Sequence, residues 1–269
     1  MDNCESCAKN GTCESKEGCN VVNNPLNKIG RVIGVMSGKG GVGKSSVAVL
    51  LAQELNRRGR KVGILDADIT GPSIPRLMGL SHERALSDGT NIIPVEHENG
   101  IKTMSLNYLI EKENEPVIWR GPMISGVVEQ FWKEVLWGEV DDLIVDMPPG
   151  TSDVALTVLQ SYPVNGVVMV TLAQDMVSMI VSKAVNMAQK MNVPVWGVVE
   201  NMSYMRCPDC GKKMPVYADE NGNDELKELG INKLGELPMT RTMLNMPKQG
   251  LDGVEDELKN ALKDIVDKL

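Results

Sequence analysis

One stretch decides the fold of this 269-residue chain: Gly38-Lys39-Gly40-Gly41-Val42-Gly43-Lys44-Ser45. It fits the phosphate-binding pattern G-x-x-x-x-G-K-[ST], and it follows the apolar run Val32-Ile33-Gly34-Val35-Met36. A strand would deliver the loop, glycines would let backbone N–H groups turn inward, and a helix from about Gly43 would point its positive end at the phosphates. A glycine-rich turn that binds nothing is the alternative, but the strand-loop-helix context favours nucleotide binding.

The same pattern assigns chemistry to individual side chains. Lys44 would reach the β- and γ-phosphates, and Ser45 would ligate Mg²⁺. Asp146 follows a buried apolar run and leads toward Gly150, so it would hold the Mg²⁺ shell through water while Gly150 could sense the γ-phosphate. The expected phosphate-binding residues are Gly38, Lys39, Gly40, Gly41, Val42, Gly43, Lys44, Ser45 and Ser46.

Two further acids follow a second buried strand. Asp66 and Asp68 come directly after Val62-Gly63-Ile64-Leu65. Because the carboxyl ends of strands in open α/β sheets face the ligand crevice, both side chains should look toward the nucleotide. They could instead cap the following turn, but their nearness to a predicted Mg²⁺ favours a functional role.

Apolar strands alternate with helical patterns along the chain. This alternation predicts an α/β fold with a doubly wound, mostly parallel sheet covered on both faces. Asp153 is expected to N-cap the helix that follows it, and residues 80–119 are expected to form a small hairpin excursion. The expected strands are 62–65, 143–145, 167–170 and 195–199, and the expected helices are 46–58, 123–136, 176–191, 224–229, 240–246 and 253–269.

Charge and hydropathy exclude two classes of partner. The net charge of −8 argues against a nucleic-acid-binding surface, which needs clustered Lys and Arg. No apolar run approaches the roughly 18 residues that a membrane span requires. The first residues are polar and bear cysteines rather than forming a basic-then-apolar leader, so we expect a cytoplasmic protein with no membrane partner.

The cysteines fall into two groups. Cys207 and Cys210 form one C-x-x-C, which in a reducing compartment suggests metal or cluster ligation rather than a disulfide. Residues 1–27 read as a cysteine-bearing tail, ahead of a nucleotide-binding domain over 28–269 with its C-x-x-C loop at 202–218. The tail cysteines are Cys4, Cys7, Cys13 and Cys19.

Several motifs occur in an order that resembles the Mrp/ApbC family of ATP-dependent iron–sulfur cluster carriers. These belong to the P-loop ATPases with a deviant Walker A motif, like the nitrogenase iron protein and the septum-site and partition ATPases, in which a lysine placed like Lys39 reaches across a dimer. The resemblance runs from Arg31 to the final helix. The motifs are residues 37–45, 65–75, 119–123, 146–151 (Asp-Met-Pro-Pro-Gly-Thr), 201–203 and 207–211 (Cys-Pro-Asp-Cys-Gly).

The resemblance implies a slow ATPase that works as a homodimer. Asp66 would support the Mg²⁺ ion together with Asp146. Lys39 would act in trans, Asp68 would orient the attacking water, and Asn201 would hold adenine. Cys207 and Cys210 would bridge a 4Fe-4S cluster with the same pair of a second subunit. The cluster would pass to apo iron–sulfur proteins, and cluster-assembly scaffolds could also be partners.

Three points stay open from the sequence. Cys4-x2-Cys7-x5-Cys13 resembles the last three cysteines of a ferredoxin-like motif found in eukaryotic scaffold relatives, and Cys19 could substitute for the absent first one, giving a second cluster. Cys-Pro-Asp-Cys-Gly is also half of a zinc ribbon, so a zinc-binding regulatory ATPase is an alternative. A partition- or septum-type positioning ATPase is a further alternative, although no basic surface helix or patch supports it.

Overall fold

The computed structural model describes residues 23–69, 71–110, 121–172, 179–217, 226 and 229–269. Cys4, Cys7, Cys13 and Cys19 lie outside these residues, so the tail over 1–27 and its cluster remain predictions. The expected helix 224–229 also falls almost wholly outside them. No helix in the described part of the chain is long and apolar enough to cross a membrane.

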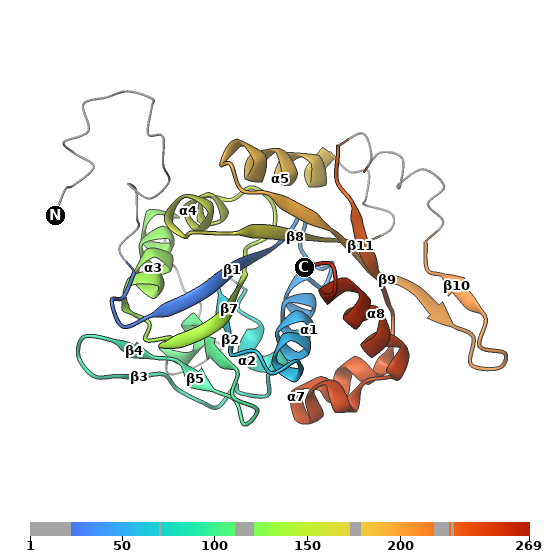
Figure 1. Ribbon diagram of the computed structural model, residues 1–269, viewed down its shortest axis with the longest axis horizontal. Helices are drawn as coiled ribbons and strands as arrows, with labels where there is room; N and C mark the ends of the chain where they lie inside the picture. Colours follow the sequence, from blue (N-terminus) through green and yellow to red (C-terminus); the bar gives the residue numbers. More distant parts are fainter. Residues whose placement is uncertain (1–22, 70, 111–120, 173–178, 218–225, 227–228) are drawn as a thin grey trace.

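A central sheet organises the described residues (Figure 1). Its strand order is β10-β9-β8-β1-β7-β2-β6-β5, with β11 pairing to β9. All pairs are parallel except β10 with β9 and β5 with β6, which lie at the two ends of the order. The strands are β1 (Lys28–Ser37), β2 (Val62–Asp66), β5 (Val95–Glu96), β6 (Lys102–Met104), β7 (Glu139–Asp146), β8 (Gly166–Thr171), β9 (Val195–Arg206), β10 (Lys213–Pro215) and β11 (Lys233–Pro238).

Helices cover both faces of this sheet, which confirms the doubly wound fold. Strand β1 shows why: Val32 and Met36 pack with the helices of one face, while Ile33 and Val35 pack with those of the other. One face carries α3 (Gly121–Glu134), α4 (Asp153–Ser161) and α5 (Met179–Lys190), and the opposite face carries α1 (Lys44–Arg57), α2 (Ile74–Leu77), α7 (Met246–Gln249) and α8 (Asp256–Val266).

The excursion after α2 is only partly the expected hairpin. Strands β3 (Leu86–Ser87) and β4 (Ile92–Ile93) form a separate antiparallel pair. Strand β6, however, joins the main sheet parallel to β2. Its buried Thr103 hydroxyl bonds to the Val95 carbonyl and to the Tyr108 hydroxyl.

The carboxyl-terminal part of the chain contains strand β11, which the apolar pattern of the sequence did not predict. Strand β11 contains Gly235 and Pro238, residues that normally weaken a strand, and among the described strands it pairs with β9 alone. Between β11 and α8, residues 240–246 were expected to form one helix. They instead form a 3-10 helix and the first residue of the short helix α7. The 3-10 helices are η3 (Leu106–Tyr108), η5 (Arg241–Asn245) and η6 (Gly250–Gly253).

The last helix packs on its own domain, as expected. Leu258, Leu262 and Ile265 of α8 are buried in the same core as the helix α1. The helix begins at Asp256 rather than at Gly253, because residues 250–253 form η6.

The amino-terminal cap of α4 differs from the expectation. Ser152, not Asp153, is the N-cap residue, and its hydroxyl accepts a hydrogen bond from the Ala155 N–H at 3.3 Å. Asp153 is the first helical residue, where its charge still favours the helix dipole.

This geometry predicts which substitution weakens α4. Ser152→Ala removes the cap and should lower the free energy of unfolding by about 1 kcal/mol. Asp153→Asn keeps the cap and should cost less, about 0.3–1 kcal/mol. Urea unfolding of both variants measures the difference, and an equal or larger loss in Asp153→Asn would contradict the assignment.

Candidate functional site

The phosphate loop has the predicted strand-loop-helix form. Strand β1 ends at Ser37, whose hydroxyl donates to the Lys39 carbonyl at 3.0 Å. Gly43 is the N-cap of α1 with φ 81°, a left-handed conformation that favours glycine. Since α1 then begins at Lys44, its first N–H groups face the loop and form an anion site.

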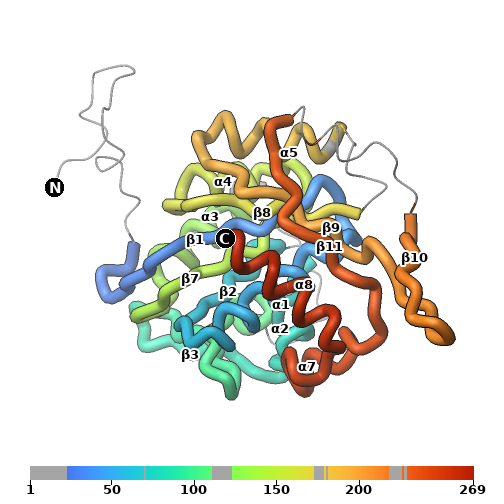
Figure 2. Tube along the Cα trace, turned by 45° about the vertical axis from the view of Figure 1, so that its right-hand side comes forward, coloured from blue at the N-terminus to red at the C-terminus, as the bar shows by residue number. Residues whose placement is uncertain are grey.

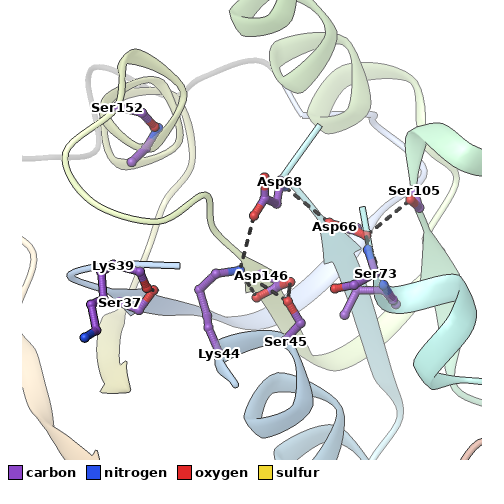
Figure 3. A network of polar contacts seen from close by, with 12 residues as sticks. Ser37, Lys39, Lys44, Ser45, Asp66, Asp68, Ser73, Ser105, Asp146 and Ser152 are labelled. Carbon is purple, nitrogen blue, oxygen red and sulfur yellow. Dashed lines mark hydrogen bonds and ion pairs between the residues drawn. The ribbon is translucent and has the colours of Figure 1, made fainter. Parts of the chain in front are cut away.

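Lys44, Ser45 and Asp146 meet at the start of α1 (Figure 3). The Lys44 ammonium donates to Asp146 Oδ1 at 2.5 Å, and the Ser45 hydroxyl donates to Asp146 Oδ2 at 2.5 Å. The Lys44 ammonium also lies 3.9 Å from Asp68 Oδ2. The structure therefore brings together four of the residues that the sequence assigned to phosphate, metal and water.

Asp66 faces a different set of partners. Its Oδ2 accepts hydrogen bonds from the backbone N–H groups of Ser73 and Ile74 at 2.9 and 3.1 Å, and from the Ser105 hydroxyl at 3.3 Å. These contacts cap α2, the structural role that the sequence left open as the alternative. A supporting role of Asp66 toward Mg²⁺ stays a prediction.

Burial perturbs both buried carboxyl groups of the site. It raises the pKa of Asp66 to about 8, and the charge of Asp146 adds to the rise. Burial also raises the pKa of Asp146, while the Lys44 ammonium opposes the shift. A divalent cation beside these oxygens would favour their ionised forms, because opposite charge stabilises a carboxylate.

The donor set fits magnesium. Ser45 Oγ of α1 and Asp146 Oδ2 at the end of β7 are hard oxygen atoms in direct contact, and Asp68 lies 3.9 Å from the Lys44 ammonium beside them. Mg²⁺ is usually held by one or two protein oxygens together with substrate phosphates and water. Ser45 and Asp146 are therefore the residues that would hold it.

A cavity of ≈ 390 Å³ opens in front of the loop. It is large enough for the phosphate chain of a nucleotide, and both Lys39 and Lys44 line it. Arg76 of α2 also lines it, although no motif in the sequence pointed to this residue. The remaining lining residues are Ser37, Gly40, Gly41, Gly43, Ser45, Ser46, Asp68, Gly71, Ser73, Leu77 and Pro149.

The loop after β7 is tied to the phosphate loop. Gly150 has φ 74°, and its N–H donates to the Ser37 carbonyl at 2.8 Å. Pro149 beside it lines the cavity. The loop after β7 is therefore tied to the phosphate loop by a hydrogen bond, while the γ-phosphate-sensing role of Gly150 stays a prediction.

Asn201 contacts the phosphate loop from strand β9. Its buried amide donates to the Val42 carbonyl at 2.9 Å, and a Cβ atom on Gly43 would meet its Nδ2 at 2.2 Å. The next residue, Met202, has φ 51°, and the pairing of β9 with β11 shifts register beside it. Asn201 is absent from the cavity lining, so its adenine-binding role remains a prediction.

The C-x-x-C lies at the tip of a hairpin rather than in a loop over 202–218. Strand β9 continues to Arg206, β10 pairs with it antiparallel, and the turn covers only residues 207–212. The Cys207 N–H donates to the Lys212 carbonyl at 3.0 Å, and the Gly211 N–H donates to the Cys207 carbonyl at 2.9 Å. The fold therefore holds the spacing of the two thiols.

Both cysteines of the hairpin are free and accessible. Cys207 is partly exposed and Cys210 is exposed. The backbone N–H groups of Cys210 and Asp209 lower the pKa of the Cys207 thiol, which favours the thiolate that binds metals. Within the described residues, no group of three or more His, Cys, Asp or Glu side chains could hold a metal ion.

Comparison with known proteins identifies the family of this chain. The family model described as "ParA: NUBPL iron-transfer P-loop NTPase" matches residues 28–269. A Clostridium perfringens protein named iron-sulfur cluster carrier protein is 50% identical over 256 residues, which are 93% of this chain and 89% of that protein.

Solved structures agree with this placement. A nucleotide-binding protein from Archaeoglobus fulgidus, in complex with ADP, has a TM-score of 0.75 at 38% identity, covering 87% of this chain and 92% of its own. The cell division ATPase MinD of Pyrococcus furiosus, at 18% identity and TM-score 0.59 over 89% and 98% of the two chains, shares the fold alone. The resemblance that the motifs suggested is confirmed, and the chain belongs to the ParA/NUBPL family of iron-transfer P-loop NTPases.

Proposed function

We propose that this protein is an ATP-hydrolysing carrier that holds a 4Fe-4S cluster on Cys207 and Cys210 and transfers it to apo iron–sulfur proteins. The observation that carries the proposal is the path of strand β9. This strand contacts the phosphate loop through Asn201 and continues to the hairpin that bears both thiols. A nucleotide-driven change at the loop thus has a direct structural route to the cluster ligands.

The carrier works as a homodimer in this proposal. A 4Fe-4S cluster takes four thiolates, whereas the hairpin supplies two. A twofold axis beside the hairpin supplies the other two from an identical chain. The proposed site of action is the cytoplasm, where reducing conditions keep such thiols free for cluster binding.

The nucleotide site supports hydrolysis by its charge arrangement. Lys44 would hold the β- and γ-phosphates, and Lys39 would reach the nucleotide of the partner subunit. Magnesium, held by Ser45 and Asp146, would neutralise phosphate charge. Asp68, 3.9 Å from the Lys44 ammonium, would orient the attacking water.

Anaerobic purification tests the proposal as a whole. The protein should carry iron and acid-labile sulfide, show the broad visible absorption of a cluster, and activate an apo iron–sulfur enzyme faster when ATP is present. A colourless protein that contains stoichiometric zinc and activates nothing would overturn the carrier function in favour of the zinc-binding ATPase.

Asp68→Asn should separate ATP binding from hydrolysis. The amide keeps the shape of the carboxylate but is a poor acceptor for the proton of the attacking water, so the rate should fall by about a hundredfold or more. ATP affinity should change little, because Lys44 and the loop N–H groups remain. Phosphate release and calorimetry measure the two quantities.

The matched control is Asp264→Asn, an exposed acid on α8 far from the loop in sequence. It should leave both quantities unchanged. Equal loss of ATP affinity and of hydrolysis in Asp68→Asn would contradict the water-orienting role.

A further inference from the structure

Helix α2 is short, and the fold holds it at both ends. It lies against α1 and α7, on the face of the sheet opposite α4 and α5 (Figures 1 and 2). At its start, the Asp66 carboxylate accepts hydrogen bonds from the Ser73 and Ile74 N–H groups. Just past its end, the chain packs so closely on α7 that a Cβ atom on Gly79 would collide with the Pro247 carbonyl. The helix therefore presents a defined side to each of its neighbours.

One side of α2 is buried and another lines the nucleotide cavity. Ile74 and Met78 are buried in the core that α2 shares with α1. Ser73, Arg76 and Leu77 instead line the cavity of ≈ 390 Å³ in front of the phosphate loop. Positions i, i+3 and i+4 lie on one side of a helix, so these three residues form a single face. The packing of the buried side thus places Arg76 at the wall of the cavity.

Arg76 brings to this wall a positive charge that the described part of the chain does not neutralise. The residue is exposed, and among the described residues no hydrogen bond or ion pair joins its side chain to another group. Lys44, in contrast, is already bonded to Asp146 at 2.5 Å. A guanidinium without a carboxylate partner is available to a phosphate group. Other arginines do pair with carboxylates of the chain: Arg31, Arg57, Arg58, Arg60 and Arg206.

The strand order assigns Arg76 to one end of the nucleotide. The phosphate loop follows β1, which lies between β8 and β7. Asp146 at the end of β7 and Asp68 after β2 lie to one side of β1, whereas Asn201 lies on β9 to the other side. The first two mark the expected position of Mg²⁺ and the γ-phosphate, and Asn201 marks that of adenine. Because α2 follows β2, Arg76 approaches from the γ-phosphate side.

We propose that Arg76 binds the terminal phosphate of ATP and makes the site distinguish a nucleoside triphosphate from a diphosphate. Its planar guanidinium can donate two parallel hydrogen bonds to phosphate oxygens. ADP lacks the γ-phosphate that would accept these bonds, so it is held by Lys44 and the loop N–H groups without help from α2. The inference rests on the proposed function, because that function places ATP in this cavity.

Comparing two nucleotides tests the role of Arg76. Arg76→Ala should weaken binding of the imido analogue of ATP, which is not hydrolysed, by about tenfold to a hundredfold, because charge-assisted hydrogen bonds are lost. Its affinity for ADP should change little. Arg76→Lys keeps the charge but not the planar pair of donors, so its affinity for the analogue should be intermediate. Calorimetry in the presence of Mg²⁺ measures each affinity.

Arg241→Ala is the matched control. Arg241 is exposed on η5 and is absent from the cavity lining, so this change removes one positive charge from the chain without altering the site. Both affinities should equal those of the parent protein. Alanine is a strong helix former, so Arg76→Ala should keep α2 folded, and circular dichroism with thermal unfolding checks this.

The ratio of the two affinities decides the outcome. A loss confined to the triphosphate analogue, in Arg76→Ala but not in Arg241→Ala, supports the inference. Unchanged affinities in Arg76→Ala overturn it, and so does an equal loss for both nucleotides, which would indicate a displaced phosphate loop. In either case, a parent protein that delivers cluster faster with ATP leaves the carrier function intact. If the parent protein binds neither nucleotide, the ATP-hydrolysing function itself is refuted, and this inference with it.

Discussion

Lys44→Ala should abolish measurable ATP binding, lowering affinity by about a hundredfold or more. The ammonium is the cation that faces the phosphates from within α1, and it also neutralises Asp146 at 2.5 Å. Without it, no ammonium would lie between the incoming phosphates and the carboxylates of Asp146 and Asp68, and the repulsion between them would oppose binding. Isothermal calorimetry with Mg-ATP measures the loss, and an unchanged affinity would refute the assignment of the loop.

Removing Lys44 also leaves a buried carboxylate without its ion-pair partner, which costs about 3–5 kcal/mol in comparable cases. Thermal unfolding of the variant is therefore measured beside its affinity. Lys61→Ala is the matched control, because Lys61 also pairs with an acid, Glu139, but lies exposed and away from the cavity. This control should bind ATP as the parent protein does.

Replacing both Cys207 and Cys210 by alanine should abolish cluster delivery to an apo-protein. The hairpin would keep its backbone pairing, since the β9–β10 ladder and the bond from the Cys207 N–H to the Lys212 carbonyl join backbone atoms only. Iron and sulfide are counted before a transfer assay, and full delivery by the double variant would contradict the assignment. Lys212→Ala, a change in the same turn, should leave delivery intact.

Deleting residues 1–19 should have a smaller effect. Ligation by Cys4, Cys7, Cys13 and Cys19 must offset the entropy of ordering a chain segment, roughly 1–2 kcal/mol per residue. We therefore expect less iron but continued delivery. Complete loss of delivery in the truncated protein would reverse the ranking of the two cysteine groups.

The parts of the structure that could be predicted from sequence are those determined by neighbouring residues. An apolar run with a turn signal beside it predicts each of these elements: the phosphate loop, α1, β2, β7 and β8. Gly43 and Lys44 fit a pattern that depends only on neighbouring residues. The doubly wound sheet then follows, because buried parallel strands need helices on both faces.

The features that sequence missed depend on residues far apart in the chain. Strand β9 continues through the polar residues Glu200, Asn201 and Ser203. Glu200 pairs with Lys233 of β11 and Asn201 with the Val42 carbonyl, whereas the Ser203 hydroxyl donates to Glu200 within the strand. The Asn201 amide, for example, bonds a carbonyl 159 residues away. The capping of α2 by Asp66 could be named in advance only as one of two alternatives, since both roles place the same carboxylate at the end of a strand.

The contact between Gly43 and Asn201 also restricts how this protein can change over evolutionary time. Any side chain at position 43 would have to adopt φ 81° and would collide with the Asn201 amide at 2.2 Å. A smaller residue at position 201 would remove the collision but also the bond to Val42. The two positions are therefore epistatic: the effect of a substitution at one depends on the residue at the other, and the order in which substitutions arise determines which are tolerated.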